Sequence, residues 1–344
     1  MLCHLSQGHH NLLTTTPQAS YLNMKLNKLF LSGLVAIAGI GLSTDVLAGG
    51  RNPGSLLLYP EFDNTAGAIT VLTVTNVLSS EVDVEFIYIG VSDAGGNPVN
   101  CEEFNRTTTL TGNDTLTLIT LAHNPQLETG YVYVFAKSGG APSTHNGLIG
   151  SQLVINGIMN FDYSVNPVSF EGIDPGSDDN GLRDLDGSEY GTAPGEILIP
   201  RFFGQGGAFD SKLILIGLTG GAAFDTMVDF EIYNDNEEMF SSSYTFHCWE
   251  KVRLLDISGV FDNGWLKNNT NHDPAEIVGA PGYEAGWMSL HGAMANSNTT
   301  SFDNPAIYAV LVEEANLVGV SDLPFEDGEN ASGALLARSN GGDF

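Results

Sequence analysis

Residues 82–90 read VDVEFIYIG and residues 228–234 read VDFEIYN, and these two stretches decide the class of fold. In both, apolar and acidic side chains alternate along the chain. The apolar positions are Val82, Val84, Phe86, Tyr88, Val228, Phe230 and Ile232, and the acidic positions are Asp83, Glu85, Asp229 and Glu231. Because successive side chains of a β-strand point to opposite faces, this alternation predicts strands with one buried face and one solvated face.

The two stretches belong to a series of strand-like segments that occurs twice in the same order. Residues 55–60 match 196–200, 69–76 match 212–219, 82–90 match 228–234, 115–121 match 251–257, and 128–132 match 284–288. The spacing between matched segments differs only by lengths that are typical of loops. We therefore predict two copies of one β-unit.

The predicted fold class is all-β, with two tandem β-sandwich domains related by the internal repeat. Several short strands in each unit of roughly 100 to 130 residues favour an immunoglobulin-like or a jelly-roll sandwich, and the sequence does not choose between them. We place the two domains at 49–173 and 195–322. An acidic Asp/Gly linker at 174–194 separates them, and a flexible C-terminal tail is expected at 323–344.

The N-terminal segment predicts export. Lys25 and Lys28 follow Met24, and a weakly polar to apolar run covers residues 29–42. This order is typical of a secretory signal peptide, which we assign to residues 24–48 with cleavage after Ala48. Residues 1–23 are interpreted as a leader that results from a start codon assigned too far upstream. The mature protein is then expected in the periplasm, at the cell surface or in the extracellular space.

The composition limits the classes of partner. The formal net charge is −29, which repels the phosphates of nucleic acids and of anionic membranes, so neither is expected as a partner. A hydrophobic content of 42% excludes a wholly disordered acidic chain. No stretch after the signal peptide is apolar enough to predict a membrane span.

Three strand features together resemble a group of uncharacterised secreted bacterial proteins. They are the Thr-Val-Thr-Asn end of residues 73–76, the valine-rich and aromatic strand at 82–90, and the Gly-Tyr-Val-Tyr-Val run at 130–134. The resemblance covers most of the mature chain. It implies export and tandem β-sandwich units, and it implies no particular activity.

The linker between the two units is a candidate calcium site. Its oxygen-bearing side chains are closely spaced, and Gly181 and Gly187 each follow an Asn or an Asp. Calcium takes six to eight oxygen ligands, which we assign here to Asp178, Asn180, Asp184, Asp186 and Glu189. The segment resembles the calcium loops of thrombospondin type-three and dockerin repeats, although Gly176 stands where those repeats have Asp. The alternative is a solvated acidic linker without a cation.

Cys101 and Cys248 remain after removal of the signal peptide. Two cysteines in an exported protein favour a disulfide, and here it would tie one domain to the other because the two positions are not equivalent in the repeat. The alternative is a pair of buried free thiols. His247 beside Cys248 is the nearest approach to a metal or thiol pair, but packing at a strand end is the favoured interpretation.

The chain contains no Gly-x-Ser-x-Gly elbow and no His-Glu-x-x-His motif. We therefore favour a noncatalytic structural or adhesive protein with calcium-stabilised sandwiches over an enzyme. A second hypothesis is a carbohydrate-binding module or glycan-active hydrolase, with Trp265, Tyr283 and Trp287 as the contact surface. A third is self-assembly through exposed strand edges into a filament or surface layer.

Overall fold

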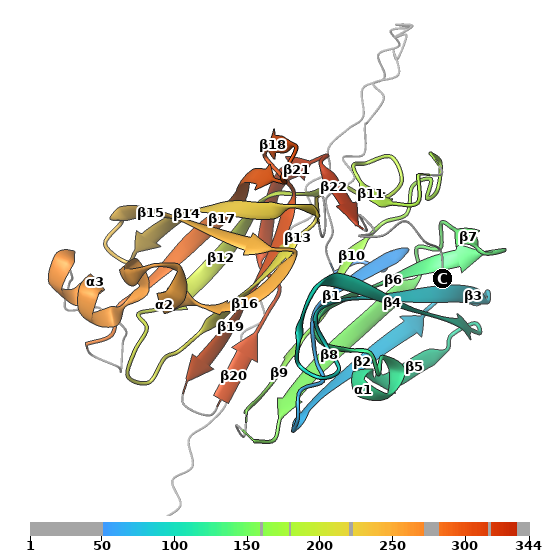
Figure 1. The fold of residues 1–344 in the computed structure, drawn as a ribbon, viewed down its shortest axis with the longest axis horizontal. Coiled ribbons are helices and arrows are strands. Elements are labelled where there is room, and N and C mark those ends of the chain that lie inside the picture. The colour runs from blue at the N-terminus through green and yellow to red at the C-terminus, as the bar shows by residue number, and fades with distance from the viewer. Residues whose placement is uncertain are drawn as a thin grey trace, which may run out of the picture. The chain divides into compact units, whose positions relative to one another are not determined.

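The strand-forming segments fold into two β-sandwich lobes in the computed structural model, which describes residues 51–158, 161–178, 180–219, 223–271, 282–315 and 318–335 (Figure 1). The predicted all-β fold with two sandwiches is confirmed. The leader at 1–23 and the signal peptide at 24–48 lie outside the described residues. All the described residues belong to one compact unit.

Lobe 1 contains β1–β10 in two antiparallel sheets. Sheet 1A has the strand order β10-β1-β6-β3-β4, with the short β7 paired to β6, and sheet 1B has the order β5-β2-β8-β9. The elements are β1 (Leu56–Asp63), β2 (Ala68–Asn76), β3 (Val82–Asp93), β4 (Pro98–Leu110), β5 (Thr115–Ile119), α1 (Thr120–His123), β6 (Leu127–Ser138), β7 (Ala141–Pro142), β8 (Leu148–Asn156), β9 (Phe161–Val165) and β10 (Val168–Phe170).

Lobe 2 contains β12–β21. Sheet 2A has the order β21-β12-β17-β14-β15, with β18 paired to β17, and sheet 2B has the order β16-β13-β19-β20. The elements are β12 (Ala193–Phe203), β13 (Lys212–Gly217), β14 (Asp225–Asn234), β15 (Met239–His247), β16 (Trp249–Arg253), α2 (Leu254–Ile257), η2 (Gly259–Phe261), α3 (Asn263–Asn269), β17 (Ala285–Asn296), β18 (Ser301–Asp303), β19 (Ile307–Ala315), β20 (Val318–Ser321) and β21 (Phe325–Asn330).

The strand orders confirm the internal repeat. Strands β10, β1, β6, β3 and β4 of sheet 1A correspond in order to β21, β12, β17, β14 and β15 of sheet 2A. Strands β5, β2, β8 and β9 of sheet 1B correspond to β16, β13, β19 and β20 of sheet 2B. The short helices α1 and α2 follow β5 and β16 in the same way.

Hydrogen bonds fix the register between the two copies more closely than the sequence does. The amide of Asn76 donates to the carbonyl of Asp114, and the amide of Gly217 donates to the carbonyl of Cys248 at the same place in the fold. Strands β2 and β13, and likewise β5 and β16, are therefore offset by two residues from their sequence match. A shift of two leaves every side chain on the same face, so strand alternation cannot detect it.

A proline bulge interrupts the central strand of each A sheet. The register shifts between Tyr59 and Phe62 in β1, around Pro60, and between Ile199 and Phe202 in β12, around Pro200. Proline has no amide hydrogen and therefore fits a strand where the ladder is already broken. The bulge leaves the Pro60 carbonyl free to accept a hydrogen bond from lobe 2.

The central strands β1 and β6 of sheet 1A are buried on both faces, whereas the edge strand β4 is largely exposed or half-buried. One set of the sheet's alternating side chains packs against Leu72, Val74 and Leu148 of sheet 1B, and that set is Leu57, Tyr59, Phe86, Tyr88, Val132 and Val134. The opposite set belongs to the cluster that forms the core of lobe 2, and it comprises Leu56, Leu58, Ile87, Ile89, Tyr131 and Tyr133. The two lobes therefore share one hydrophobic cluster rather than meeting through a polar hinge.

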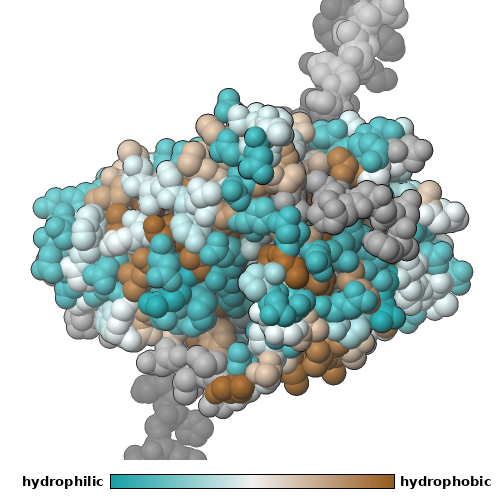
Figure 2. Space-filling model, in the orientation of Figure 1, coloured by the Kyte–Doolittle hydropathy of each residue, from teal (hydrophilic) through white to brown (hydrophobic). Residues whose placement is uncertain are grey.

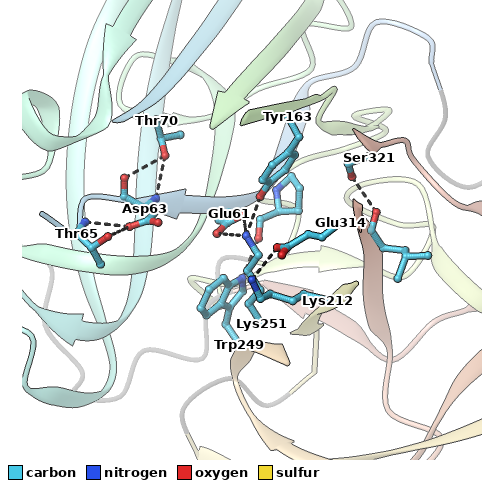
Figure 3. Close-up of polar contacts among 12 residues, drawn as sticks. Glu61, Asp63, Thr65, Thr70, Tyr163, Lys212, Trp249, Lys251, Glu314 and Ser321 are labelled. Carbon is cyan, nitrogen blue, oxygen red and sulfur yellow. Dashed lines mark hydrogen bonds and ion pairs between the residues drawn. The ribbon is translucent and has the colours of Figure 1, made fainter. Parts of the chain in front are cut away.

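The contact between the lobes is centred on the bulge of β1 (Figure 3). The Trp249 indole nitrogen donates to the Pro60 carbonyl at 2.8 Å. The Lys251 ammonium lies 2.9 and 3.0 Å from the two carboxylate oxygens of Glu61, and 4.9 Å from the ring centre of Tyr163. Glu61 is 3% exposed, so burial raises its pKa while the Lys251 charge acts in the opposite direction.

A disulfide joins the lobes at one edge of this contact. Cys101 in β4 is bonded to Cys248, which lies between β15 and β16, so the predicted bridge between the lobes is confirmed. The bond closes a separation of 147 residues in sequence. In the chain-entropy description, a loop of that length stabilises the folded state by about 5 kcal/mol.

Two expectations from the sequence are wrong. The face of β3 that begins with Asp83 and Glu85 is not solvated throughout, because Ile87 and Ile89 on it are 2% and 5% exposed under lobe 2. The segment expected to be a flexible tail contains β21, which pairs with β12, and β22 (Gly333–Leu335), which pairs with β11 (Arg183–Leu185) of the linker. Residues 336–344 of that tail lie outside the described residues.

Loss of the interlobe ammonium is expected to destabilise the whole protein. Lys251→Met leaves the Glu61 carboxylate buried without its counter-charge, which should lower the free energy of unfolding by about 3 to 5 kcal/mol in urea at pH 8. The double variant Glu61→Gln/Lys251→Met should recover most of this loss because no charge remains buried.

Arg253→Met on the same strand is the matched control, since it removes only an exposed ion pair with Asp210. That change should cost less than about 1 kcal/mol. Equal losses in Lys251→Met, the double variant and Arg253→Met would contradict a role for the buried charge pair.

Candidate functional site

The acidic loop between the lobes gathers two carboxylates around one amide. Asn180 Nδ2 lies within hydrogen-bond distance of Asp178 Oδ2 and 3.0 Å from Asp184 Oδ2. Asn180 Oδ1 accepts the amide hydrogen of Leu182, and Asp178 Oδ1 accepts that of Asn180. Gly176, Gly181 and Gly187 all have positive φ, a conformation that glycine adopts without strain and that lets the loop turn tightly.

The Glu189 carboxylate is hydrogen-bonded to the backbone of this loop at two places. Its side chain is 1% exposed, and its two oxygens accept the backbone amide hydrogens of Gly176 and Asp184. Burial raises the pKa of Glu189, whereas these amide hydrogen bonds act in the opposite direction. Asp186 accepts the amide hydrogen of Ser188. Glu189 thus holds two parts of the loop backbone together through hydrogen bonds. The sequence did not distinguish this role from that of the neighbouring acidic residues.

The calcium site at Asp178, Asn180, Asp184, Asp186 and Glu189 stays a prediction. Within the part of the chain that the structure describes, no group of three or more His, Cys, Asp or Glu side chains is arranged to hold a metal ion. Asp179 lies outside the described residues. Burial, followed by the charges of Asp178 and Asp186, raises the pKa of Asp184, while its hydrogen bond to Asn180 lowers it. The loop therefore concentrates negative charge, which Arg183, the Asn180 amide and backbone amides offset in part.

His247 bridges the lobes rather than packing in a core. Its Nδ1 lies 2.9 Å from Asp225 Oδ1, and its Nε2 lies 2.7 Å from Asn100 Oδ1 in lobe 1. His247 is the last residue of β15, so its expected place at a strand end is confirmed, and its side chain is 37% exposed with polar partners. Since Cys248 is in the disulfide, the two residues offer no thiol pair.

The three aromatic residues predicted as a contact surface have different surroundings. Trp265 in α3 packs edge-on against Phe240, and Tyr283 packs edge-on against Phe209. Trp287 in β17 is 40% exposed and stacks on Tyr233 of β14 with a 4.4 Å centroid separation and a 4° angle between the rings. Among these residues, Trp287 is the one that lies on an open sheet face.

The outer face of sheet 2A around Trp287 carries further apolar side chains that the sequence reasoning missed. Met239 is 60% exposed and its sulfur lies 3.3 Å from the Tyr233 hydroxyl, while Phe325 is 65% exposed and pairs with Leu198. Their outward positions follow from strand alternation once β15 and β21 are known. The sequence predicts a flexible tail around Phe325, and a tail has no strand alternation from which an outward position could be inferred.

One buried carboxyl group has a strongly altered ionisation. Glu326 in β21 accepts a hydrogen bond of 2.9 Å from the hydroxyl of the buried Tyr308, and its second oxygen has no hydrogen-bond partner among the described residues. Burial raises the pKa of Glu326 from 4.5 to about 7, although the Tyr308 hydrogen bond acts in the opposite direction. Such a shift is found at catalytic acids and also at buried structural carboxyl groups.

Comparisons with other proteins leave the chain without an assigned relative. Comparison with known protein families gives no match, and a search of curated proteins finds no relative. None of the helices in the described residues is long and apolar enough to cross a membrane.

Replacing Glu326 should make stability less dependent on pH. In the wild type the folded protein keeps the Glu326 proton up to about pH 7, whereas the unfolded chain loses it near pH 4.5. The relative stabilisation is therefore fully present below about pH 4.5 and is lost as the pH rises to 7. Glu326→Gln should raise the free energy of unfolding at pH 8 by up to about 3 kcal/mol and leave it nearly unchanged at pH 4.

Urea unfolding at both pH values measures this difference. Glu329→Gln on the same strand is the control, because Glu329 is exposed and its replacement should shift stability equally at pH 4 and pH 8. A Glu326→Gln effect of the same size at both pH values would show that Glu326 ionises normally in the folded protein.

Proposed function

We propose that the protein is a noncatalytic, exported structural or adhesive protein that acts as one rigid body. The observation that carries this proposal is the single hydrophobic cluster that includes both faces of sheet 2B and one face of sheet 1A. Two lobes that share a core cannot open and close around a substrate without exposing that core.

Further contacts support a load-bearing rather than a mobile arrangement. The disulfide, the Glu61–Lys251 pair and the Trp249–Pro60 hydrogen bond all join the same two lobes. The net charge of −29 favours solubility outside the cell. A protein of this kind would present its wide sheet faces and acidic loop to a surface or to other molecules.

A carbohydrate-binding module or glycan-active hydrolase is the second candidate. The observation that favours it is the exposed Trp287–Tyr233 stack with the Glu231 carboxylate 3.2 Å from the Tyr233 hydroxyl. Aromatic side chains with a polar group beside them are suited to amphipathic ligands such as sugars. Trp265 and Tyr283 pack against other rings and are therefore weaker candidates for this contact.

A polysaccharide hydrolase panel and a glycan array test these two functions together. The noncatalytic proposal predicts no turnover, and cells that lack the protein should show altered adhesion or surface integrity without losing growth on any polysaccharide. Turnover of any substrate would overturn the proposal. Glycan binding that is lost in Trp287→Ala and kept in Trp265→Ala would instead support the carbohydrate-binding candidate.

We also propose that the acidic loop binds calcium through Asp178, Asn180, Asp184 and Asp186. Its support is the crowding of Asp178 and Asp184 around the Asn180 side chain, together with the charges that raise the Asp184 pKa. A divalent cation would offset this repulsion with oxygen ligands of the kind that calcium prefers. Because both oxygens of Glu189 accept backbone hydrogen bonds, we now assign it to bracing the loop rather than to the metal.

Calcium should raise the melting temperature of the protein and slow proteolysis between residues 184 and 190. Calorimetric titration with calcium should show binding that Asp184→Asn abolishes and that Asp303→Asn, an exposed change outside the loop, leaves unchanged. Equal cleavage rates with calcium and with chelator, together with no heat of binding, would refute the calcium site without affecting the structural proposal.

A further inference from the structure

The two lobes pack head to tail, because the contact joins different faces of the repeated unit. Lobe 1 contributes the outer face of sheet 1A, and lobe 2 contributes the outer face of sheet 2B, which includes Ile214, Ile216, Trp249 and Lys251. Because an A sheet of one lobe contacts a B sheet of the other, one outer A-sheet face and one outer B-sheet face remain free. The unused faces here are the outer faces of sheet 1B and sheet 2A.

Three positions on the free face of sheet 2A are apolar, like the matched positions of sheet 1A that contact lobe 2. The matched registers place Leu198, Tyr233 and Trp287 at the positions of Leu58, Ile89 and Tyr131. In lobe 1 those three positions are buried beside the Pro60 bulge, with exposures of 1%, 5% and 3%. In lobe 2 the Tyr233–Trp287 stack lies on an open face, and Trp287 is 40% exposed.

Other positions on the same face are polar in sheet 2A. The matched positions of Leu56, Ile87, Tyr133 and Phe135 hold Glu196, Glu231, Ser289 and His291. In lobe 1 the Arg183 guanidinium of the connector lies 4.8 Å from the ring centre of Phe135. Sheet 2A therefore keeps only part of the apolar surface that is buried in sheet 1A.

The free face of sheet 1B carries few charges for so acidic a chain, and Asp162 of β9, opposite Ile155, is the charged residue in its strands. Strands β2, β5 and β8 contain no charged residue. Their outward side chains include Thr73 and Thr75, which correspond to the buried Ile214 and Ile216 of sheet 2B, and the exposed Ile119, Ile149 and Leu153. Figure 2 shows hydrophobic surface gathered along the lower edge of lobe 1, where sheet 1B lies in Figure 1.

We propose that a second copy of this chain docks the outer face of its sheet 1B onto the outer face of sheet 2A, which repeats between molecules the contact between the lobes. Because the faces differ, each added copy exposes a new sheet 2A face, and the contact extends into an open chain of molecules. This inference goes beyond the proposed function, since a rigid structural protein could also act as a monomer. The proposed assembly joins sheet faces, whereas the assembly hypothesis from the sequence joins exposed strand edges.

Charge makes this contact weaker than the one between the lobes. The Glu61–Lys251 pair is replaced by Arg201 and Thr117, and Arg201 already pairs with Glu313. The 1B face carries Asp162 in β9, and two molecules of net charge −29 repel each other at long range. Assembly should therefore grow with protein concentration and with ionic strength.

Sedimentation velocity of the full mature protein at rising concentration, in low and high salt, tests the proposal. Wild type should form a ladder of oligomers at high salt. Trp287→Glu and Leu153→Glu should each raise the dissociation constant about thirtyfold or more, as expected for a central interface residue. The control is Val318→Glu, an exposed position in β20 of sheet 2B that belongs to neither docking face.

Mixing the two defective variants gives the decisive outcome. Leu153→Glu keeps a working 2A face and Trp287→Glu keeps a working 1B face, so the mixture should form dimers that contain one of each and do not grow. Circular dichroism and melting temperature establish that each variant folds. A wild type that stays monomeric at all concentrations and salt levels, or variants that assemble singly as well as wild type does, would overturn the proposal.

Discussion

The burial of strands β1 and β6 of sheet 1A on both faces is the constraint on which the rest of the structure depends. A sheet in an antiparallel sandwich usually has one face packed on the core and one face exposed to solvent. Here Leu57 and Tyr59 of β1 face sheet 1B, while Leu56 and Leu58 face lobe 2. Removing lobe 2 would expose a full layer of aromatic and aliphatic side chains, so neither lobe is expected to be independent of the other.

This double burial explains why a buried ion pair between the lobes needs further hydrogen-bond partners. A charge that is moved into a hydrophobic interface is costly unless a partner and hydrogen bonds accompany it. Glu61 and Lys251 satisfy this condition together, with Tyr163 beside the ammonium group. The Pro60 bulge supplies the remaining acceptor, because its carbonyl is released from the strand ladder and reaches the Trp249 indole.

Because the unit is repeated, a buried face in lobe 1 can be compared with the matching free face in lobe 2. The same side of the unit is an interface in sheet 1A and a free face in sheet 2A, and its residues follow that difference. Where lobe 1 has Ile89 and Tyr131 in contact with lobe 2, lobe 2 has the exposed Tyr233 and Trp287. Other positions that are apolar in sheet 1A, Leu56 and Ile87, are replaced by Glu196 and Glu231, so the free face of sheet 2A keeps only part of the apolar surface of its counterpart.

The sequence by itself predicted the strand content, the two copies of the unit and a bridge between Cys101 and Cys248, because side-chain alternation is a local signal and a pair of cysteines is a compositional one. It could not determine what covers each face. Whether Ile87 meets water or another sheet, and whether Phe325 belongs to a tail or a strand, depends on partners more than a hundred residues away in the chain. The sequence pattern also does not reveal the two-residue offset between the copies, since every side chain stays on the same face of its sheet. Only the tertiary structure decided these points, because burial and strand register are properties of pairs of segments that no single segment encodes.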